Sequence, residues 1–219
     1  MIRTETAAWN GELQEILSKP ETFDLLIFTS RNGVRSFFEL LQRQGQTLPA
    51  GVKTAVIGRG TAQELALRHG KADYLQPGNT SRDFAGYLKS KVLKGGEKIL
   101  LALGNLAPAF LQNELASVAS VRRINVYRTL PEENYDKTVL QKALTGQYGL
   151  LVFSSPSGFS HFYEICQKNR ATCPLRIVSI GPVTTQAIRK QTRAQVFTAT
   201  VPGTEGLLKE IKKYFHLKH

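Results

Sequence analysis

The sequence has little cysteine and no long hydrophobic run. Only Cys166 and Cys173 are present, with six residues between them, and no histidine accompanies them at metal-ligand spacing. We therefore expect two reduced, partly buried thiols and no metal site. A membrane-spanning helix needs about 20 consecutive apolar residues. Because no segment approaches that length, we expect a soluble protein that does not span a membrane.

The opening residues, MIRTETAAWNGELQE, lack the apolar stretch and the small-residue cleavage site of a secretory signal. The expected compartment is therefore the cytoplasm. Hydrophobic residues make up 42% of the 219 positions and charged residues 21%, as in globular proteins. A chain of this length can form one large α/β domain or two smaller lobes, so composition leaves the number of domains open.

The common catalytic signatures are also missing. The sequence has no phosphate-binding Gly-Lys-Thr loop, no GxSxG elbow and no HExxH pair. The segment GRGTAQ, which starts at Gly58, lacks the last glycine of a dinucleotide-binding fingerprint. The histidines are scattered and suggest no catalytic or metal-binding cluster; they are His69, His161, His216 and His219.

The charge is strongly unbalanced. Lysine and arginine number 29 against 17 acidic residues, a formal net charge of +12. Such an excess favours a polyanionic partner, and nucleic acid, anionic lipid and a polycarboxylate metabolite all remain open. The basic residues are dispersed, and no recognition motif or aromatic stacking cluster supports nucleic acid.

An internal repeat runs through the sequence. LLIFTSRNGVRSFFELL (25–41) matches LLVFSSPSGFSHFYEIC (150–166) at an offset of 125 residues. VKTAVIGRGTAQELA (52–66) matches LRIVSIGPVTTQAIR (175–189) at an offset of 123 residues. In both halves a proline–glycine turn and a helix-like segment follow. Three matches in the same order predict two homologous lobes.

Each half alternates short apolar or β-branched runs with segments of helical periodicity. This pattern predicts an α/β fold with a parallel sheet flanked by helices in each lobe. The expected strands of the first lobe are 24–29, 52–57, 72–75, 98–103 and 121–127. Those of the second lobe are 149–153, 176–180 and 195–198, preceded by a helix at 132–144. The second lobe is therefore short of strands.

Hydroxyl side chains follow the expected strands in both lobes. Ligands of open parallel sheets bind beyond the carboxyl ends of the strands, where these residues fall: Thr29, Ser30, Thr61, Ser154, Ser155 and Thr184. Such hydroxyls either only cap helices or border N–H groups that bind carboxylate or phosphate. Arginines near the same helix starts are Arg31, Arg35, Arg59 and Arg82. Tyr127 ends a strand, where a phenol can donate a proton or simply pack.

In chain order, IFTSRNGV, VIGRGTA, VYRT, VFSSPSG and IGPVTTQAI resemble the motifs of the uroporphyrinogen-III synthase family, over nearly the whole chain. The resemblance implies two α/β lobes joined by a pair of crossing strands, with hydroxymethylbilane held in the cleft between them. It also implies an enzyme without metal or organic cofactor, which eliminates the bilane hydroxyl and closes the macrocycle through a spiro intermediate, with ring D inverted. Eight carboxylates on this substrate agree with the basic charge.

The motif match also assigns roles to residues and segments. Tyr127 corresponds to the family tyrosine proposed to help the hydroxyl leave. The residues expected to bind substrate are Ser30, Arg31, Thr61, Ser154, Ser155 and Thr184. The expected lobes are 7–124 and 132–219, and the segments 1–6 and 125–131 are the expected crossover strands.

The start of the chain departs from the family pattern. Family members usually begin with a strand, a threonine–arginine turn and a helix, whereas MIRTE resembles the crossing strand that comes next. We expect the second lobe to lack that first unit, which would weaken or abolish activity and leave a sheet edge for self-association. Leu103 stands where relatives often have an arginine. A two-lobed binding protein without catalysis is therefore the alternative function.

Overall fold

A computed structural model of the protein describes residues 2–78, 80–171, 175–201 and 203–216. Within those ranges, every helix is too short or too polar to traverse a membrane.

One of the two cysteines lies in the described part of the chain. Cys166 is buried, whereas Cys173 and His219 lie outside the described residues. The chain divides into two compact units, which are described separately: the N-terminal unit, Thr4–Leu130, and the C-terminal unit, Met1–Arg3 with Pro131–His219.

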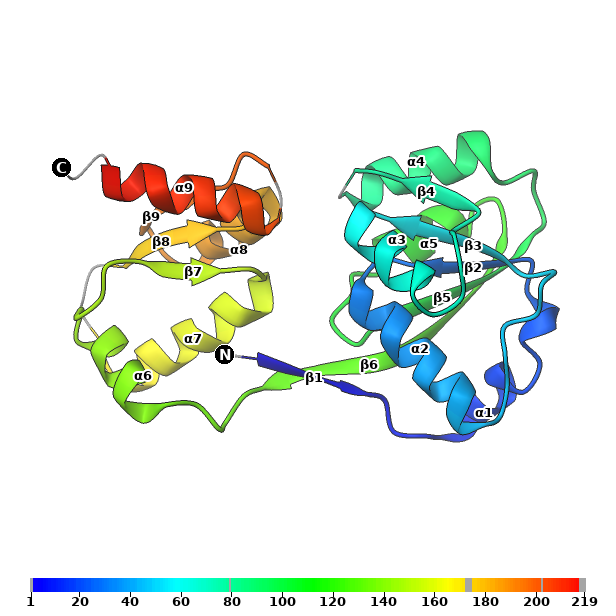
Figure 1. The fold of residues 1–219 in the computed structure, drawn as a ribbon, viewed down its shortest axis with the longest axis horizontal. Coiled ribbons are helices and arrows are strands. Elements are labelled where there is room, and N and C mark those ends of the chain that lie inside the picture. Colours follow the sequence, from blue (N-terminus) through cyan, green and yellow to red (C-terminus); the bar gives the residue numbers. More distant parts are fainter. Residues whose placement is uncertain (1, 79, 172–174, 202, 217–219) are drawn as a thin grey trace. The chain divides into compact units, whose positions relative to one another are not determined.

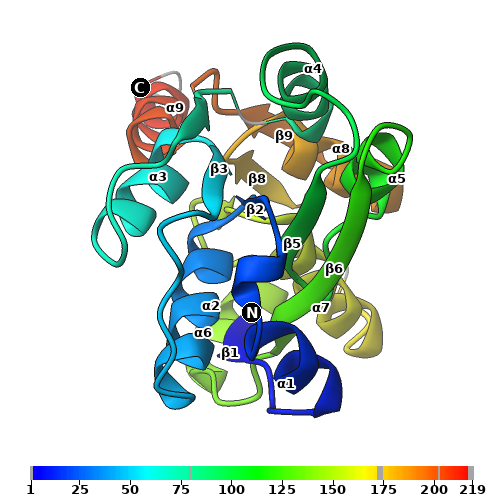
Figure 2. The same ribbon diagram turned by 90° about the vertical axis from the view of Figure 1, so that its right-hand side faces the viewer.

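The N-terminal unit is built on a six-stranded sheet in the order β1-β6-β5-β2-β3-β4 (Figure 1). The strands of this sheet are β1 (Ile2–Thr6), β2 (Leu25–Phe28), β3 (Lys53–Ile57), β4 (Tyr74–Gln76), β5 (Lys98–Gly104) and β6 (Ser120–Pro131), and β1 and β6 run past the bounds of the unit by Ile2–Arg3 and Pro131. The pairs β2–β3, β2–β5, β3–β4 and β5–β6 are parallel, and Figure 2 shows β5 and β6 side by side. All five strands predicted for this lobe are present.

Helices cover both faces of this sheet. They are α1 (Gly11–Leu17), the 3-10 helix η1 (Pro20–Thr22), α2 (Arg31–Arg43), α3 (Arg59–Ala66), α4 (Ser81–Lys91) and α5 (Phe110–Leu115). Leu26 and Phe28 of β2 pack in the cluster that includes residues of α1, α2 and α3. Leu25 and Ile27 pack in the cluster with residues of α4 and α5. The apolar run of β2 is therefore buried throughout, as a central parallel strand requires.

The C-terminal unit contains a three-stranded parallel sheet in the order β7-β8-β9. Its elements are α6 (Lys137–Leu144), β7 (Leu151–Phe153), α7 (Pro156–Lys168), β8 (Arg176–Ser179), α8 (Pro182–Gln191), β9 (Gln195–Thr198) and α9 (Thr204–His216). All three predicted strands are present. A small cluster of Phe159, Ile177 and Ile188 forms the core.

The predicted helix at 132–144 begins later than expected. Its N-cap is Asp136, whose carboxylate accepts hydrogen bonds from the N–H groups of Thr138 and Val139. This cap satisfies two N–H groups that have no partner within the helix. Helical periodicity alone did not locate that start.

Candidate active site at the carboxyl ends of the strands

Matching serine caps begin one helix in each unit. Ser30 follows β2 and caps α2, with its Oγ accepting a hydrogen bond from Gly33 N–H at 3.0 Å. Ser155 follows β7 and caps α7, with its Oγ accepting from Gly158 N–H at 3.1 Å. The φ and ψ angles are −153° and 154° at Ser30, and −156° and 152° at Ser155. The repeat in the sequence is thus a repeat of local geometry.

Buried threonines occupy the same place in the next pair of helices. Thr61 is the third residue of α3 and Thr184 the third residue of α8, and both are buried. The N-cap is a glycine in each case, Gly58 or Gly181, with no side-chain cap bond. Both threonines therefore help to pack a helix start, while N–H groups of the first turn are the groups suited to an anion.

The two units differ in the first residue of these helices. Arg31 and Arg59 begin α2 and α3, whereas Pro156 and Pro182 begin α7 and α8. A methyl group built on Gly60 would lie 3.6 Å from Cδ and 3.7 Å from Nε of Arg31, so the Arg31 stem passes over the start of α3. Because β2 and β3 are parallel neighbours, both arginines lie at one edge of the sheet.

Tyr127 contacts Ser30, the residue that caps α2, and this contact was not predicted from the sequence. Ser30 Oγ donates a hydrogen bond to Tyr127 Oη at 3.2 Å while accepting the bond from Gly33 N–H. Both side chains are half-buried. The hydrogen between the two oxygens belongs to Ser30, which leaves the phenolic hydrogen available to another acceptor. This geometry suits a proton donor.

A β-bulge in β6 directs Tyr127 toward α2. Leu103 pairs with Asn125 but Gly104 pairs with Tyr127, so the register skips Val126. Successive residues of a regular strand face opposite sides of the sheet. Here Val126 and Tyr127 both pack against the cluster that holds residues of α2. The extra residue therefore brings the phenol to the face where Ser30 lies.

Gly104 makes room for the tyrosine ring. A methyl group built on Gly104 would lie 2.6 Å from Cε2 and 2.7 Å from Oη of Tyr127, and would also overlap Cζ. Gly104 has no positive φ, so the ring, not the backbone, excludes a side chain. Sequence reasoning missed this residue. The available signal was a glycine at the end of the buried run KILLALG.

The C-terminal unit places its two serines at a groove. Ser154 and Ser155 line a hollow of about 490 Å³ beside α6, β7 and α7. The remaining lining is mainly apolar and includes Val139, Leu151 and Phe162. Ser154 is exposed, whereas Ser155 is half-buried under its cap bond. In this unit, the predicted hydroxyls thus border an apolar surface.

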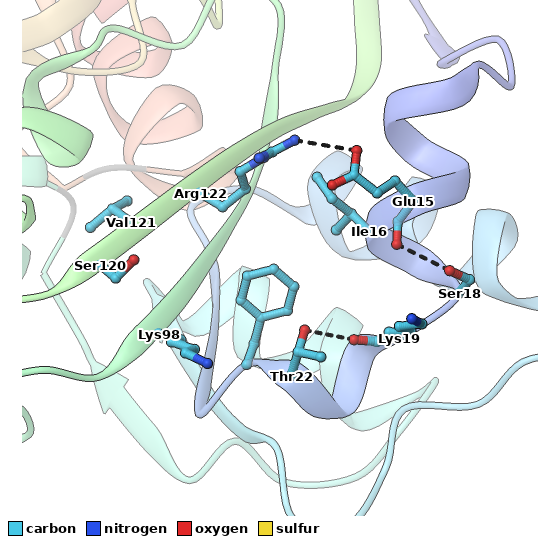
Figure 3. Close-up of a pocket in the computed structure, with 10 residues that line it drawn as sticks. Glu15, Ile16, Ser18, Lys19, Thr22, Lys98, Ser120, Val121 and Arg122 are labelled. Carbon is cyan, nitrogen blue, oxygen red and sulfur yellow. Dashed lines mark hydrogen bonds and ion pairs between the residues drawn. The ribbon is translucent and has the colours of Figure 1, made fainter.

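A larger hollow, of about 670 Å³, lies at the other end of the N-terminal unit's sheet (Figure 3). Lys98 and Ser120, the first residues of β5 and β6, line it together with residues of α1. Arg122 faces Glu15 there, with 3.8 Å between the guanidinium and carboxylate. None of the predicted site residues lines this hollow.

A charged cluster joins α2 to α3 behind the helix starts. Glu64 accepts hydrogen bonds from Arg68 at 2.9 Å and from Arg35 at 3.2 Å. The bond from Arg68, with that from Arg35 and the charges of both, holds the pKa of Glu64 below its ordinary value despite burial. Arg35 is thereby a structural partner of Glu64, while Arg82 lies over the Phe110 ring at 5.7 Å.

Comparisons with known proteins agree with this architecture. The family model described as uroporphyrinogen-III synthase HemD matches residues 1–209. The uroporphyrinogen-III synthase of Synechococcus elongatus is 25% identical over 218 residues, which cover 92% of this chain and 79% of that protein.

Two crystal structures have a similar fold. A mutant uroporphyrinogen III synthase from the extremely thermophilic bacterium Thermus thermophilus matches with a TM-score of 0.70 and 20% identity, over 99% of this chain and 87% of that chain. The uroporphyrinogen-III synthetase of Helicobacter pylori 26695 matches with a TM-score of 0.66 and 17% identity, over 97% of this chain and 90% of that chain.

Proposed function

Because this chain belongs to the uroporphyrinogen-III synthase family, lyases of tetrapyrrole biosynthesis, we propose that Tyr127 is the proton donor with which it cyclises hydroxymethylbilane. The observation that carries this role is the bond from Ser30 Oγ to Tyr127 Oη. That bond orients the phenol and leaves its hydrogen for the hydroxyl of the substrate. The expected products are uroporphyrinogen III, with ring D inverted, and water.

The proton balance of this proposal closes within one turnover. As the carbon–oxygen bond of the bilane breaks, its electron pair leaves with the oxygen, and the Tyr127 proton completes a water molecule. Loss of water leaves a cationic methylene carbon on ring A, which the substituted carbon of ring D attacks to form the spiro intermediate. The bond from that ring D carbon to the bridge with ring C then breaks, and the bridge re-forms at the unsubstituted carbon of ring D, whose proton is lost and restores the phenol. General acids of this kind contribute about 10²- to 10⁴-fold. Orientation of a flexible substrate supplies much of the remaining effect.

The substrate's carboxylates are proposed to bind at the helix starts of both units. Arg31 offers a charge-assisted bond, and Thr61, Ser154, Ser155 and Thr184 lie at or beside first turns whose N–H groups attract anions. In this assignment Thr61 and Thr184 act by packing those turns, because both are buried. Ser154, which is exposed, contacts a carboxylate directly.

The deciding experiment is incubation of the purified chain with freshly prepared hydroxymethylbilane, followed by separation of the oxidised porphyrin isomers. An excess of the type III isomer over the enzyme-free control is expected. Formation of the type I isomer alone, at the spontaneous rate, would contradict catalysis. If the bilane still bound under those conditions, the chain would be a binding protein without chemistry, the alternative that the family match disfavours.

We propose that the polyanionic partner is the bilane and not nucleic acid, and that the enzyme works in the cytoplasm. A molecule with eight carboxylates does not cross an apolar bilayer unaided, so enzyme and bilane must share one compartment. Fluorescence anisotropy of a labelled DNA or RNA duplex tests the choice of partner, and no change is expected when the protein is added. Steep salt-dependent binding to either duplex would contradict that choice. Cell fractionation tests the compartment, and recovery of the protein with the membranes would contradict the cytoplasm.

Self-association through β7 is also proposed. β7 is an end strand of its three-stranded sheet, and Val152 on it is 46% exposed. An exposed strand of this kind can pair with a second chain. Light scattering should show dimers that Val152→Lys converts to monomers. A wild-type monomer at high concentration would contradict the proposal.

A further inference from the structure

The geometry points to Ser30 and Gly104 as positioning residues that hold Tyr127 in its reactive orientation, a role that rests on the acid function proposed above. The motif match predicted Ser30 to be a substrate-binding residue. Its hydroxyl, however, already accepts the Gly33 N–H and donates its hydrogen to Tyr127 Oη. A hydroxyl has one hydrogen to donate. Ser30 therefore acts on the substrate through the phenol.

The chain of bonds runs from the start of α2 to the phenol. Gly33 N–H donates to Ser30 Oγ, and Ser30 Oγ donates to Tyr127 Oη. When Tyr127 gives up its proton, its oxygen keeps the hydrogen bond from Ser30 and gains negative charge. The positive end of the α2 dipole favours that charge. The same bonds thus orient the phenol before proton transfer and stabilise it afterwards.

The backbone brings α2 close enough for this contact. A methyl group built on Gly33 would lie 2.9 Å from the carbonyl oxygen of Ala102, on β5. A real side chain essentially never approaches backbone that closely, so Gly33 permits the first turn of α2 to rest on β5. Any larger residue there would push Ser30 away from the strand whose end carries Gly104.

Gly104 makes the second contact that fixes the Tyr127 side chain. The bulge at Val126 turns the Tyr127 ring onto Gly104, and the three atoms nearest to a methyl group on Gly104 all belong to that ring. The ring is thus confined by the sheet on one side and by the Ser30 hydroxyl at its oxygen. A side chain at Gly104 would displace the phenol by steric overlap alone.

A stability cycle tests the Gly104 role without any assay of activity. Gly104→Ala should lower the melting temperature by about 5 °C when Tyr127 is present, but not in the Tyr127→Ala background, where the ring is gone. Gly86→Ala is the matched control, since nothing lies within 4 Å of a methyl group at that exposed helical position. Equal losses from Gly104→Ala in both backgrounds would overturn the assignment.

A spectroscopic comparison tests the Ser30 role. In protein labelled with 3-fluorotyrosine, the fluorine resonance missing from Tyr127→Phe identifies Tyr127. Ser30→Ala should shift that resonance and Ser30→Thr should return it toward the wild-type position. Ser155→Ala, which removes the equivalent cap in the C-terminal unit, should leave it in place. An unmoved resonance in Ser30→Ala would overturn the role.

Kinetics then separate positioning from direct substrate binding. Ser30→Ala should lower kcat about tenfold with KM unchanged, as expected for loss of one hydrogen bond to the phenol. In the Tyr127→Phe background it should have no further effect on kcat. A raised KM, or an effect that adds to Tyr127→Phe, would mean that Ser30 contacts substrate and would overturn the inference.

The two proposals can fail separately. If Tyr127→Phe kept the wild-type kcat, the acid function would be wrong. The fluorine resonance and the Gly104 stability cycle would still report whether Ser30 and Gly104 hold the ring, because neither measurement requires turnover.

Discussion

The N-terminal and C-terminal units share their helix-start geometry but differ in the charges placed there. Ser30 and Ser155 have nearly the same dihedral angles and the same cap bond. Arginines follow in the N-terminal unit, at Arg31 and Arg59, where the C-terminal unit has prolines. Both units therefore present the N–H groups of their helix starts, but only in the N-terminal unit is an arginine the first residue of these helices.

The contacts between equivalent helices differ in the same way. In the N-terminal unit, Arg35 and Arg68 bind the Glu64 carboxylate between α2 and α3. At the places of the two arginines, α7 and α8 are joined by a neutral bond from Gln191 Nε2 to Ser160 Oγ at 2.8 Å. The contact between the two helices is therefore charged in the N-terminal unit and neutral in the C-terminal unit.

The largest expected effect comes from Tyr127, whose hydroxyl is bonded to the Ser30 cap of the N-terminal unit. Tyr127→Phe keeps the ring on Gly104 but removes the proton donor, so kcat should fall about 10²-fold at unchanged melting temperature. Stopped-flow or quenched turnover of hydroxymethylbilane measures it. An unchanged kcat in a variant with normal thermal unfolding would contradict the proton-donor role of Tyr127, and the N-terminal unit would then lose its proposed catalytic residue.

Exchange of a helix-start residue tests the charge difference. Arg31→Pro gives α2 the first residue of α7, and the extended backbone of Ser30 tolerates a following proline. The fold should persist while KM rises about tenfold, because one charge-assisted bond is lost. Arg31→Lys retains the charge and should recover part of the affinity. A KM that is equal for wild type and Arg31→Pro would show that Arg31 does not bind substrate.

Acid should weaken the contact between α2 and α3 specifically. The pKa of Glu64 is held below its ordinary value by Arg68 first and then by Arg35, so its ionised form stabilises the fold. This contribution is complete above the ordinary pKa of 4.5 and is lost as pH falls through the lower folded pKa.

The matching experiment is urea unfolding of Glu64→Gln between pH 3 and 7. The variant should lose about 1 to 2 kcal/mol at pH 7, with the two arginines partly exposed, and the difference should shrink below pH 4.5. Gln191→Met, at the neutral contact between α7 and α8, should show a difference independent of pH. A pH-independent loss in Glu64→Gln would contradict the assigned ion pair.

The smallest expected effect concerns the shared feature of the two units. Ser155→Ala should lower the free energy of unfolding by about 1 kcal/mol, the usual cost of an N-cap serine. Ser30→Ala should lose a similar amount from its cap, plus the bond to Tyr127. Thermal or urea denaturation compares them. A markedly larger loss from Ser155→Ala would show that the two caps are not equivalent.

Local patterns in the sequence predicted the elements and their caps well. The strands follow from apolar runs such as LLIF, and the Ser30 and Ser155 caps from a hydroxyl between strand and helix. Both signals depend on neighbouring residues alone. The start of α6 was misplaced, because its cap at Asp136 lay inside a stretch interpreted as helical.

The contacts of Tyr127 with Ser30 and Gly104 could not be predicted in the same way. Ser30 and Tyr127 are separated by 97 residues, and their contact depends on the bulge that skips Val126. One residue of register decides which face of a sheet a side chain occupies. No local pattern marks that shift. The role of Gly104 depends on it as well, because the ring reaches Gly104 only after the bulge.

The amino-acid sequence thus specified the α/β class, the duplicated helix starts and the family, because these features depend on short-range periodicity and on the order of motifs along the chain. Tertiary structure alone decided that the Ser30 hydroxyl donates to Tyr127, that Arg31 crosses Gly60, and that Gly104 must lack a side chain. These contacts arise where separate strands and helices meet, and they depend on the register and distance between elements.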